Sequence, residues 1–182
     1  MFNKSILAAT LITFAAITSS YAAPATPAQK TESPIKVTKD EKIGSWKYIC
    51  ADIKDPNGKV SNKCTISQTA TKKVDGKDVP VVSVEIFKTQ GENVVNVLAP
   101  LNVFLPSGAG IEIDGQKDKT AKVPFIYCNP IGCKAEGKMA ADLIEGLKKG
   151  SNAKVLVNSI YEGKKELPIS LNGLGDAMAK LN

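Results

Sequence analysis

The residues best suited to chemistry in this sequence are its four cysteines, Cys50, Cys64, Cys128 and Cys133. Four thiols can form disulfides, hold a metal ion or act as a redox centre. Zinc sites normally use tight C-x2-C pairs, whereas the spacings here are C-x13-C and C-x4-C. A redox centre needs C-x2-C or an activated thiolate, and the sequence shows neither. The spacing therefore favours structural disulfides, and we expect no metal and no cofactor.

The first 22 residues indicate the compartment in which these cysteines act. Lys4 precedes an uncharged, mostly apolar run at 5–17, and Ser20 and Ala22 supply the small residues of a cleavage site. The alternative is an uncleaved anchor, but the run is shorter than the roughly 20 residues that span a bilayer. No cysteine stands at the cleavage point, which argues against a lipoprotein, and no later segment is apolar enough to span. We expect a signal peptide at 1–22 and an exported chain in an oxidising space.

Four cysteines allow three pairings, and the local sequence favours the two short ones. Residues 129–132 read Asn-Pro-Ile-Gly, the preference pattern of a type I turn that would bring Cys128 and Cys133 together. Cys50 and Cys64 flank a polar loop with Pro56-Asn57-Gly58 as its turn. Closing that loop should stabilise the fold by roughly 3 kcal/mol in the chain-entropy model.

The rest of the chain reads as a flexible N-terminal arm at 23–42 followed by one β-rich domain at 43–182. The arm is rich in Pro, Thr, Lys and Ala and has no apolar period. Beyond it, apolar residues alternate with polar ones in short segments punctuated by Gly, Pro and Asn, which predicts an antiparallel β-sandwich or barrel-like domain. The alternating faces are Trp46/Tyr48/Cys50, Val82/Val84/Ile86, the odd positions 95–105 with a break at Pro100, Ile111/Ile113, Val155/Val157/Tyr161 and Leu167/Ile169/Leu171.

Two segments have a helical period instead. Met139, Leu143, Ile144 and Leu147 share one face, with Lys148 and Lys149 in the last turn and Gly150 as the C-terminal cap. Leu174, Met178 and Leu181 share a face of a second short helix, for which Asn172 is a candidate N-cap. We expect both apolar stripes, and the side chains of Trp46, Phe125 and Tyr127, to face the core. Trp46 is expected to pack on the first disulfide.

Composition limits the possible chemistry. The sequence contains no His and no Arg, and all 24 basic residues are Lys. Losing Lys4 with the signal peptide leaves 23 lysines against 18 acidic residues, a charge of +5. No G-x-S-x-G or H-E-x-x-H motif occurs, and a triad would lack its His, so we expect no catalytic residues and no enzyme; a Ser–Lys dyad is the enzymatic alternative. The lysines are dispersed and not interleaved with aromatics, which argues against nucleic-acid binding, and the charged loop at 115–122 is interpreted as a solvated turn.

Several stretches together resemble the bacterial family called invasion-associated locus B. They are WKYIC at 46–50, CTISQ at 64–68, LPSGAGIEIDG at 105–115, PFIYCNPIGCKA at 124–135, LKKG at 147–150 and ISLNGLGDAMAKL at 169–181. Leu174 departs from the family pattern, which usually has an aromatic after the Gly. The signal peptide and the four-cysteine layout agree with the family, and the resemblance covers roughly residues 44–181.

The resemblance implies an exported β-rich protein of the periplasm, the outer membrane or the extracellular space. Its namesakes are linked to the entry of bacteria into host cells, so a host-cell surface component or another envelope protein is the implied partner. The family brings no catalytic residues that could be carried over to this sequence. The alternative function is a periplasmic structural or stress-related protein without host contact.

Overall fold

The computed structural model of the protein describes residues 35–116 and 120–181. All of the described helices and strands belong to one compact unit, which extends from Ser33 to Asn182. The expected signal peptide at 1–22, and the part of the expected arm that precedes residue 35, lie outside the described residues. So does the centre of the charged loop, at 117–119.

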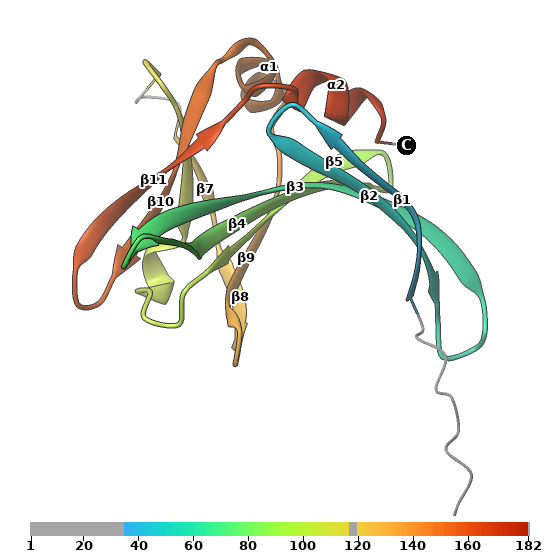
Figure 1. Cartoon of the computed structure of the whole chain (residues 1–182), viewed down its shortest axis with the longest axis horizontal. Coiled ribbons are helices and arrows are strands. Elements are labelled where there is room, and N and C mark those ends of the chain that lie inside the picture. The colour runs from blue at the N-terminus through green and yellow to red at the C-terminus, as the bar shows by residue number, and fades with distance from the viewer. Residues whose placement is uncertain (1–34, 117–119, 182) are drawn as a thin grey trace, which may run out of the picture. The chain divides into compact units, whose positions relative to one another are not determined.

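The described strands form two antiparallel sheets (Figure 1). The larger sheet has seven strands in the order β1-β2-β3-β4-β5-β9-β8, and the smaller has four in the order β11-β10-β6-β7. The larger sheet comprises β1 (Ile35–Ile43), β2 (Trp46–Lys54), β3 (Val60–Val74), β4 (Lys77–Thr89), β5 (Glu92–Ala99), β8 (Phe125–Asn129) and β9 (Gly132–Lys138). The smaller comprises β6 (Ala109–Ile113), β7 (Ala121–Val123), β10 (Asn152–Ser159) and β11 (Gly163–Ser170).

One hydrophobic core lies between the two sheets. Alternating residues of β2, β4, β5 and β9 meet alternating residues of β6, β10 and β11, as antiparallel sheets with one buried face require. The sheets have open edges and do not close on each other, so the sandwich alternative is confirmed and the barrel-like one is not. The fully buried members include Trp46, Ile66, Ile86, Val97, Ile111 and Val155.

Both expected helices are present and lie together at one end of the sandwich (Figure 1). Helix α1 (Ala141–Lys149) buries Leu143 and Leu147, and α2 (Leu174–Ala179) buries Leu174, Ala177 and Met178. Leu174 is fully buried, so an aliphatic side chain fills the core position at which the family pattern has an aromatic. Gly173, with φ 82°, caps the N-terminus of α2, so the expectation of an Asn172 cap is wrong.

The expected flexible arm at 23–42 is wrong for its last eight residues, which belong to strand β1. Residues 35–43 pair with β2 from Ile35↔Ile53 to Ile43↔Trp46, with a bulge near Thr38. Strand β1 is an edge strand whose side chains are almost all exposed on both faces. It therefore has no apolar alternation, and the backbone ladder rather than a buried face holds it in place.

The alternating faces are correct in most strands and fail in three places: after Pro100, in the β10–β11 turn, and within β8, where the register shifts between Phe125 and Tyr127. Val95, Val97 and Ala99 are buried, β5 ends at Ala99, and Pro100 breaks the run as expected. Beyond Pro100 the chain no longer alternates between two faces, because it forms a loop and a short 3-10 helix, η1 (Leu105–Ser107). The residues expected to face inward that are instead exposed are Leu101, Leu105, Tyr127 and Tyr161, whereas Phe125 is half-buried.

Candidate interaction surface

The structure pairs Cys50 with Cys64 and Cys128 with Cys133, the two local pairings that the sequence favours. Cys50 on β2 lies directly opposite Cys64 on β3, and the two Cα atoms are 4.0 Å apart. Cys128 on β8 lies opposite Cys133 on β9, also with a Cα separation of 4.0 Å. Each bond therefore closes a hairpin within one sheet, and none of the described cysteines is free.

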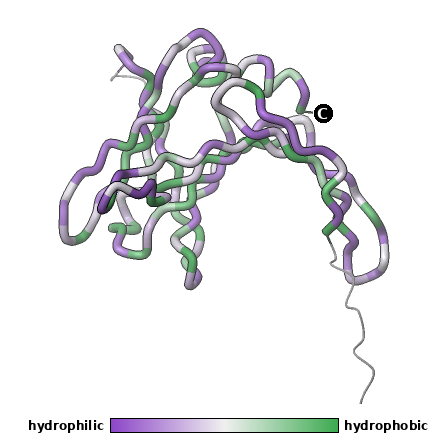
Figure 2. The backbone as a smooth tube through the Cα atoms, viewed as in Figure 1, coloured by the Kyte–Doolittle hydropathy of each residue, from purple (hydrophilic) through white to green (hydrophobic). Residues whose placement is uncertain are grey.

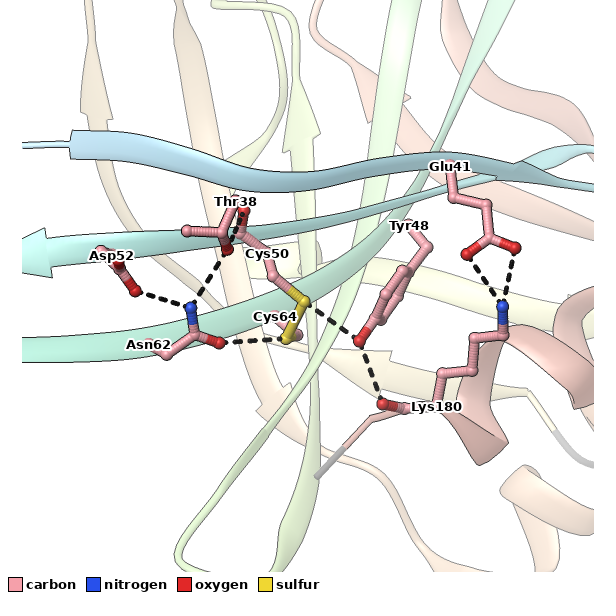
Figure 3. Close-up of a disulfide and its surroundings, with 8 residues drawn as sticks. All are labelled: Thr38, Glu41, Tyr48, Cys50, Asp52, Asn62, Cys64 and Lys180. Atoms are coloured by element: carbon pink, nitrogen blue, oxygen red, sulfur yellow. Dashed lines mark hydrogen bonds and ion pairs between the residues drawn. A yellow bond between two sulfur atoms is a disulfide. The ribbon is translucent and has the colours of Figure 1, made fainter.

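Polar side chains surround the first disulfide on three strands (Figure 3). The Asn62 amide donates to Asp52 Oδ1 at 2.7 Å and to Thr38 Oγ1 at 3.2 Å, and the Thr38 hydroxyl donates to the Cys50 carbonyl at 3.2 Å. These bonds join β1, β2 and β3 beside the sulfur atoms. They tie three neighbouring strands of the larger sheet together.

The aromatic side chain at the first disulfide is Tyr48 rather than the expected Trp46. The Tyr48 hydroxyl lies 3.0 Å from Cys50 Sγ and 3.2 Å from the Lys180 carbonyl oxygen. Lys180 also forms an ion pair with Glu41, at 2.7 and 2.8 Å to the two carboxylate oxygens (Figure 3). This contact connects the disulfide on β2 to the residue that follows α2, so the two ends of the described chain meet here.

Three of the stretches that carry the family resemblance meet at one point between the sheets. Gln68 of CTISQ donates to the Ser170 carbonyl at 2.9 Å and accepts from the Ser170 N–H at 2.8 Å. The Trp46 indole N–H of WKYIC donates to the same Ser170 carbonyl at 3.0 Å. Ser170 lies in ISLNGL, so these residues link β2 and β3 of the larger sheet to β11 of the smaller one. Their role is to hold the two sheets in register.

The first turn and the C-terminal segment approach closely at two glycines. Gly44 has φ +58°, and a Cβ placed on it would lie 2.4 Å from the Asn172 carbonyl oxygen. Gly173 has φ +82°, and its Cβ would lie 2.5 Å from the Ile43 carbonyl oxygen. The Ser45 N–H donates to the Asn172 carbonyl at 3.0 Å. Only residues without a side chain allow this backbone contact.

Residues 35–116 and 120–181 contain no group of three or more His, Cys, Asp or Glu side chains that could hold a metal ion. The side chains whose pKa values are shifted are Glu166 and Lys154, which are exposed on the smaller sheet. Hydrogen bonds from Lys164 and Lys154 lower the pKa of Glu166, and the bond to Glu166 raises the pKa of Lys154. Ion pairs of this kind are ordinary features of a solvated sheet.

Exposed apolar side chains occur instead on three turns, and these turns lie at the end of the sandwich away from the helices (Figure 1). We call them the apolar tips: the loop at 100–107, the β8–β9 turn at 130–131 and the β10–β11 turn at 160–162. Tyr161 is 81% exposed and Ile131 is 76% exposed, values that are unusual for side chains of this size. The other exposed members are Leu101, Phe104, Leu105 and Ile160.

Hydrogen bonds hold the apolar tips in fixed positions. The Phe104 N–H donates to the Asn158 carbonyl at 2.7 Å, and the Ile160 N–H donates to the Asn102 carbonyl at 2.9 Å, so the first and third tips lie side by side. The Ser159 hydroxyl accepts from the N–H groups of Tyr161 and Glu162 at 3.3 and 3.2 Å.

The second tip joins this group through a shared surface depression. Ile131 and Pro100 both line a depression of about 240 Å³, which brings the tip at 130–131 next to the loop at 100–107. The Ile131 N–H donates to Asn129 Oδ1 at 3.0 Å, and the second disulfide closes the hairpin at Cys128 and Cys133. The tip therefore has little freedom to fold its side chain away from water.

A second, smaller set of exposed aliphatic residues lies at the far end of the β1–β2–β3 segment, beyond the first disulfide. Val37 and Val60 are each 57% exposed, and Ile53 is 38% exposed. In Figure 2 this segment carries a hydrophobic stretch, and hydrophilic residues lie beside it on the neighbouring strands. It is less apolar than the three tips, because Lys36, Lys39 and Lys54 are interspersed with the aliphatic residues.

The structure thus brings the four sequence-predicted cysteines into two structural bonds, and it adds the apolar tips, which sequence reasoning missed. The signal was present in the sequence, because no charged residue occurs between Glu92 and Glu112, although that interval contains a loop. None of the helices in residues 35–116 and 120–181 has the length and apolarity needed to cross a bilayer.

Comparison with known proteins gives two findings. The family model described as "Invasion associated locus B (IalB) protein" matches residues 46–182. The crystal structure of invasion associated protein B from Bartonella henselae is similar in fold, with a TM-score of 0.63 and 18% sequence identity. That likeness covers 79% of this chain and 95% of the other. No curated protein matches the sequence.

Proposed function

The chain belongs to the invasion associated locus B family, and from this premise we propose that it is an exported, non-enzymatic protein that promotes bacterial invasion of, or interaction with, host cells. The compartment is the periplasm, the outer membrane or the extracellular space. Family membership is the observation that carries the proposal. The partner is a component of the host-cell surface or another envelope protein.

Three structural features support this proposal. Both disulfides suit an oxidising compartment outside the cytoplasm. Residues from three of the stretches that carry the family resemblance meet between the two sheets, where Trp46 and Gln68 both bond to Ser170. Six large apolar side chains are exposed on the apolar tips, and exposed apolar surface of this kind is typical of sites that contact a protein or a membrane.

The proposal is tested with purified oxidised protein that begins at Ala23 and with a strain that lacks the gene. We expect the protein to bind intact host cells in a saturable manner, and we expect the deletion strain to enter them less often. The control is a complemented strain that expresses the same chain. Unsaturable background binding together with wild-type entry by the deletion strain would refute the proposal.

A second candidate function is a periplasmic structural or stress-related protein without direct host contact. It is favoured by the use of the motif residues for fold integrity rather than for an accessible site. Fractionation combined with protease treatment of intact cells separates the two candidates. Protein that is degraded on intact cells, or found in the medium, supports host interaction, whereas protein wholly protected inside the outer membrane supports the structural role.

A further inference from the structure

We propose that the three apolar tips form a membrane-docking surface that inserts into the headgroup region of a phospholipid bilayer containing anionic lipids. The inference deepens the proposed function by naming a partner, and it rests on that function only for export. Its basis is the arrangement of Leu101, Phe104, Leu105, Ile131, Ile160 and Tyr161 at one end of the sandwich.

The shape of this end suits a bilayer better than a protein partner. The three tips are protruding turns with separate exposed side chains, and the depressions beside them, next to Ile131 and next to Pro106 and Ser107, have volumes of about 240 and 320 Å³. In a complex between two proteins, exposed apolar side chains normally fit into pockets on the partner, or the docking protein itself has a groove that receives the partner. The headgroup region of a bilayer is fluid and needs no matching pockets. Aliphatic and aromatic side chains, such as Phe104 and Tyr161 here, are the kind that enter it.

Charge at the tips also fits an anionic bilayer. The loop at 100–107 and the turn at 130–131 contain no charged residue, so no side-chain charge opposes their burial. Glu162 is the one acidic residue on the three tips, and it pairs with Lys165 at 3.4 Å. Lys164 and Lys165 follow the third tip and form exposed ion pairs with Glu166 at 2.9 Å and Glu162 at 3.4 Å, weak contacts that their long side chains can exchange for lipid phosphates while the tip is inserted.

The net charge of the chain adds a long-range attraction. Without Lys4 the chain carries 23 lysines and 18 acidic residues, a charge of +5 that favours an anionic surface. The exposed ion pairs at the tip, such as Lys165–Glu162, are weak and can exchange for lipid phosphates. Attraction by charge and insertion of the tips are the two contributions that a peripheral protein combines for stable binding.

The test measures binding of the oxidised protein beginning at Ala23 to vesicles of phosphatidylcholine with phosphatidylglycerol, and to vesicles of phosphatidylcholine alone. The tip variant carries Phe104→Ser, Ile131→Ser and Tyr161→Ser. The matched control carries Val37→Ser, Ile53→Ser and Val60→Ser at the other exposed aliphatic set. Both variants lose three apolar side chains and keep the charge of the parent.

We expect the parent and the control to bind the anionic vesicles, and the tip variant to bind about 1,000-fold more weakly, since each of its three large side chains contributes roughly tenfold. Added salt should weaken binding without abolishing it. Equal binding by the tip variant and the control, or no binding of the parent, overturns the inference. So does a parent that self-associates through these residues without binding vesicles, which would assign the tips to a second copy of the chain.

A spectroscopic probe keeps the test informative if the triple variant does not fold. Trp46 is the only Trp and is buried, so its emission already reports an apolar environment. Tyr161→Trp places a second indole on the most exposed tip. We expect its emission to shift to shorter wavelength with anionic vesicles, and an unchanged spectrum overturns the inference. Vesicle binding without host-cell binding refutes the proposed function alone, whereas host-cell binding without vesicle binding refutes only this inference.

Discussion

At the scale of single residues, the side chain of Gln68 connects three segments of the chain through its amide group. Its amide both donates to and accepts from the backbone of Ser170, and a further bond at 3.2 Å reaches the Ser45 carbonyl. All of these bonds cross from β3 to other elements. The side chain of Gln68 thereby bonds the backbone N–H and C=O groups of Ser170, which at the boundary of the two sheets would otherwise need a neighbouring strand as partner.

Replacing Gln68 by Ala should lower the free energy of unfolding by about 1–3 kcal/mol, because the Ser170 N–H loses its partner in a partly buried position. Reversible urea unfolding of the oxidised protein measures the change. The control is Thr69→Ala, whose exposed hydroxyl bonds only the Ser83 hydroxyl at 2.8 Å. If the control costs as much as Gln68→Ala, the contact between the sheets is not the source of the effect.

Glu166, with the two lysines that bond to it, Lys164 and Lys154, predicts a pH dependence of stability. Since folding lowers the pKa of Glu166 below its ordinary 4.5, the stabilisation is present above that value and is lost as the pH falls through the folded pKa. Folding raises the pKa of Lys154 above 10.5, so its contribution is present below that value and is lost as the pH rises through the folded pKa.

Glu166→Gln should therefore be slightly less stable than the parent at neutral pH and equal to it at strongly acidic pH. Thermal unfolding of both proteins across the acidic range measures the difference. The effect is small because both side chains are exposed and salt screens them. A gap that stays constant through the acidic range would mean that the carboxylate charge is not responsible.

At the scale of elements, the two glycines at the first turn fix how the β1–β2 hairpin meets the C-terminal segment. Gly44→Ala should destabilise the fold by roughly 3 kcal/mol or more, because both the left-handed backbone and the contact with Asn172 oppose a side chain. The control is Gly76→Ala, which has φ +76° but open space around it, and should cost only about 1–2 kcal/mol. Equal losses in denaturant unfolding would show that the close approach contributes nothing.

The two hairpin disulfides should differ in their contributions. Cys50 and Cys64 are 14 residues apart, whereas Cys128 and Cys133 are 5 apart. In the chain-entropy model, replacing the first pair by Ser should lower the free energy of unfolding by about 3 kcal/mol and the second pair by about 2 kcal/mol. Urea unfolding of the two double variants gives both values. The reverse order would indicate that native-state contacts, rather than loop length, set the difference.

The elements that sequence reasoning predicts well are those with one buried face. The alternation of Val82, Val84 and Ile86 was sufficient for β4, and the spacing of Leu143 and Leu147 was sufficient for α1. Strand β1 could not be predicted in this way, because an edge strand with exposed side chains leaves no apolar period in the sequence. The apolar tips were missed for the opposite reason. Leu105 and Tyr161 keep the apolar spacing of the preceding strand in the sequence, although the strand has already ended and both side chains are exposed.

At the scale of the whole molecule, β1 covers one edge of the larger sheet. A chain beginning at Gly44 lacks β1 and leaves the edge of β2 unpaired, so we expect it to aggregate more readily and unfold at lower temperature than a chain beginning at Ser33. Light scattering during thermal unfolding measures both properties. Identical behaviour of the two chains would show that residues 35–43 are the dispensable arm that composition alone predicts.

The cysteines are bonded in the order in which they occur, the first with the second and the third with the fourth. In a chain exported N-terminus first, as proposed above, each thiol would meet its native partner before any competing cysteine emerges. A simple oxidant is then sufficient, and reshuffling by an isomerase is unnecessary. We expect reduced protein to regain its native linkages in a plain glutathione buffer, and the cell to make this protein without a proofreading step.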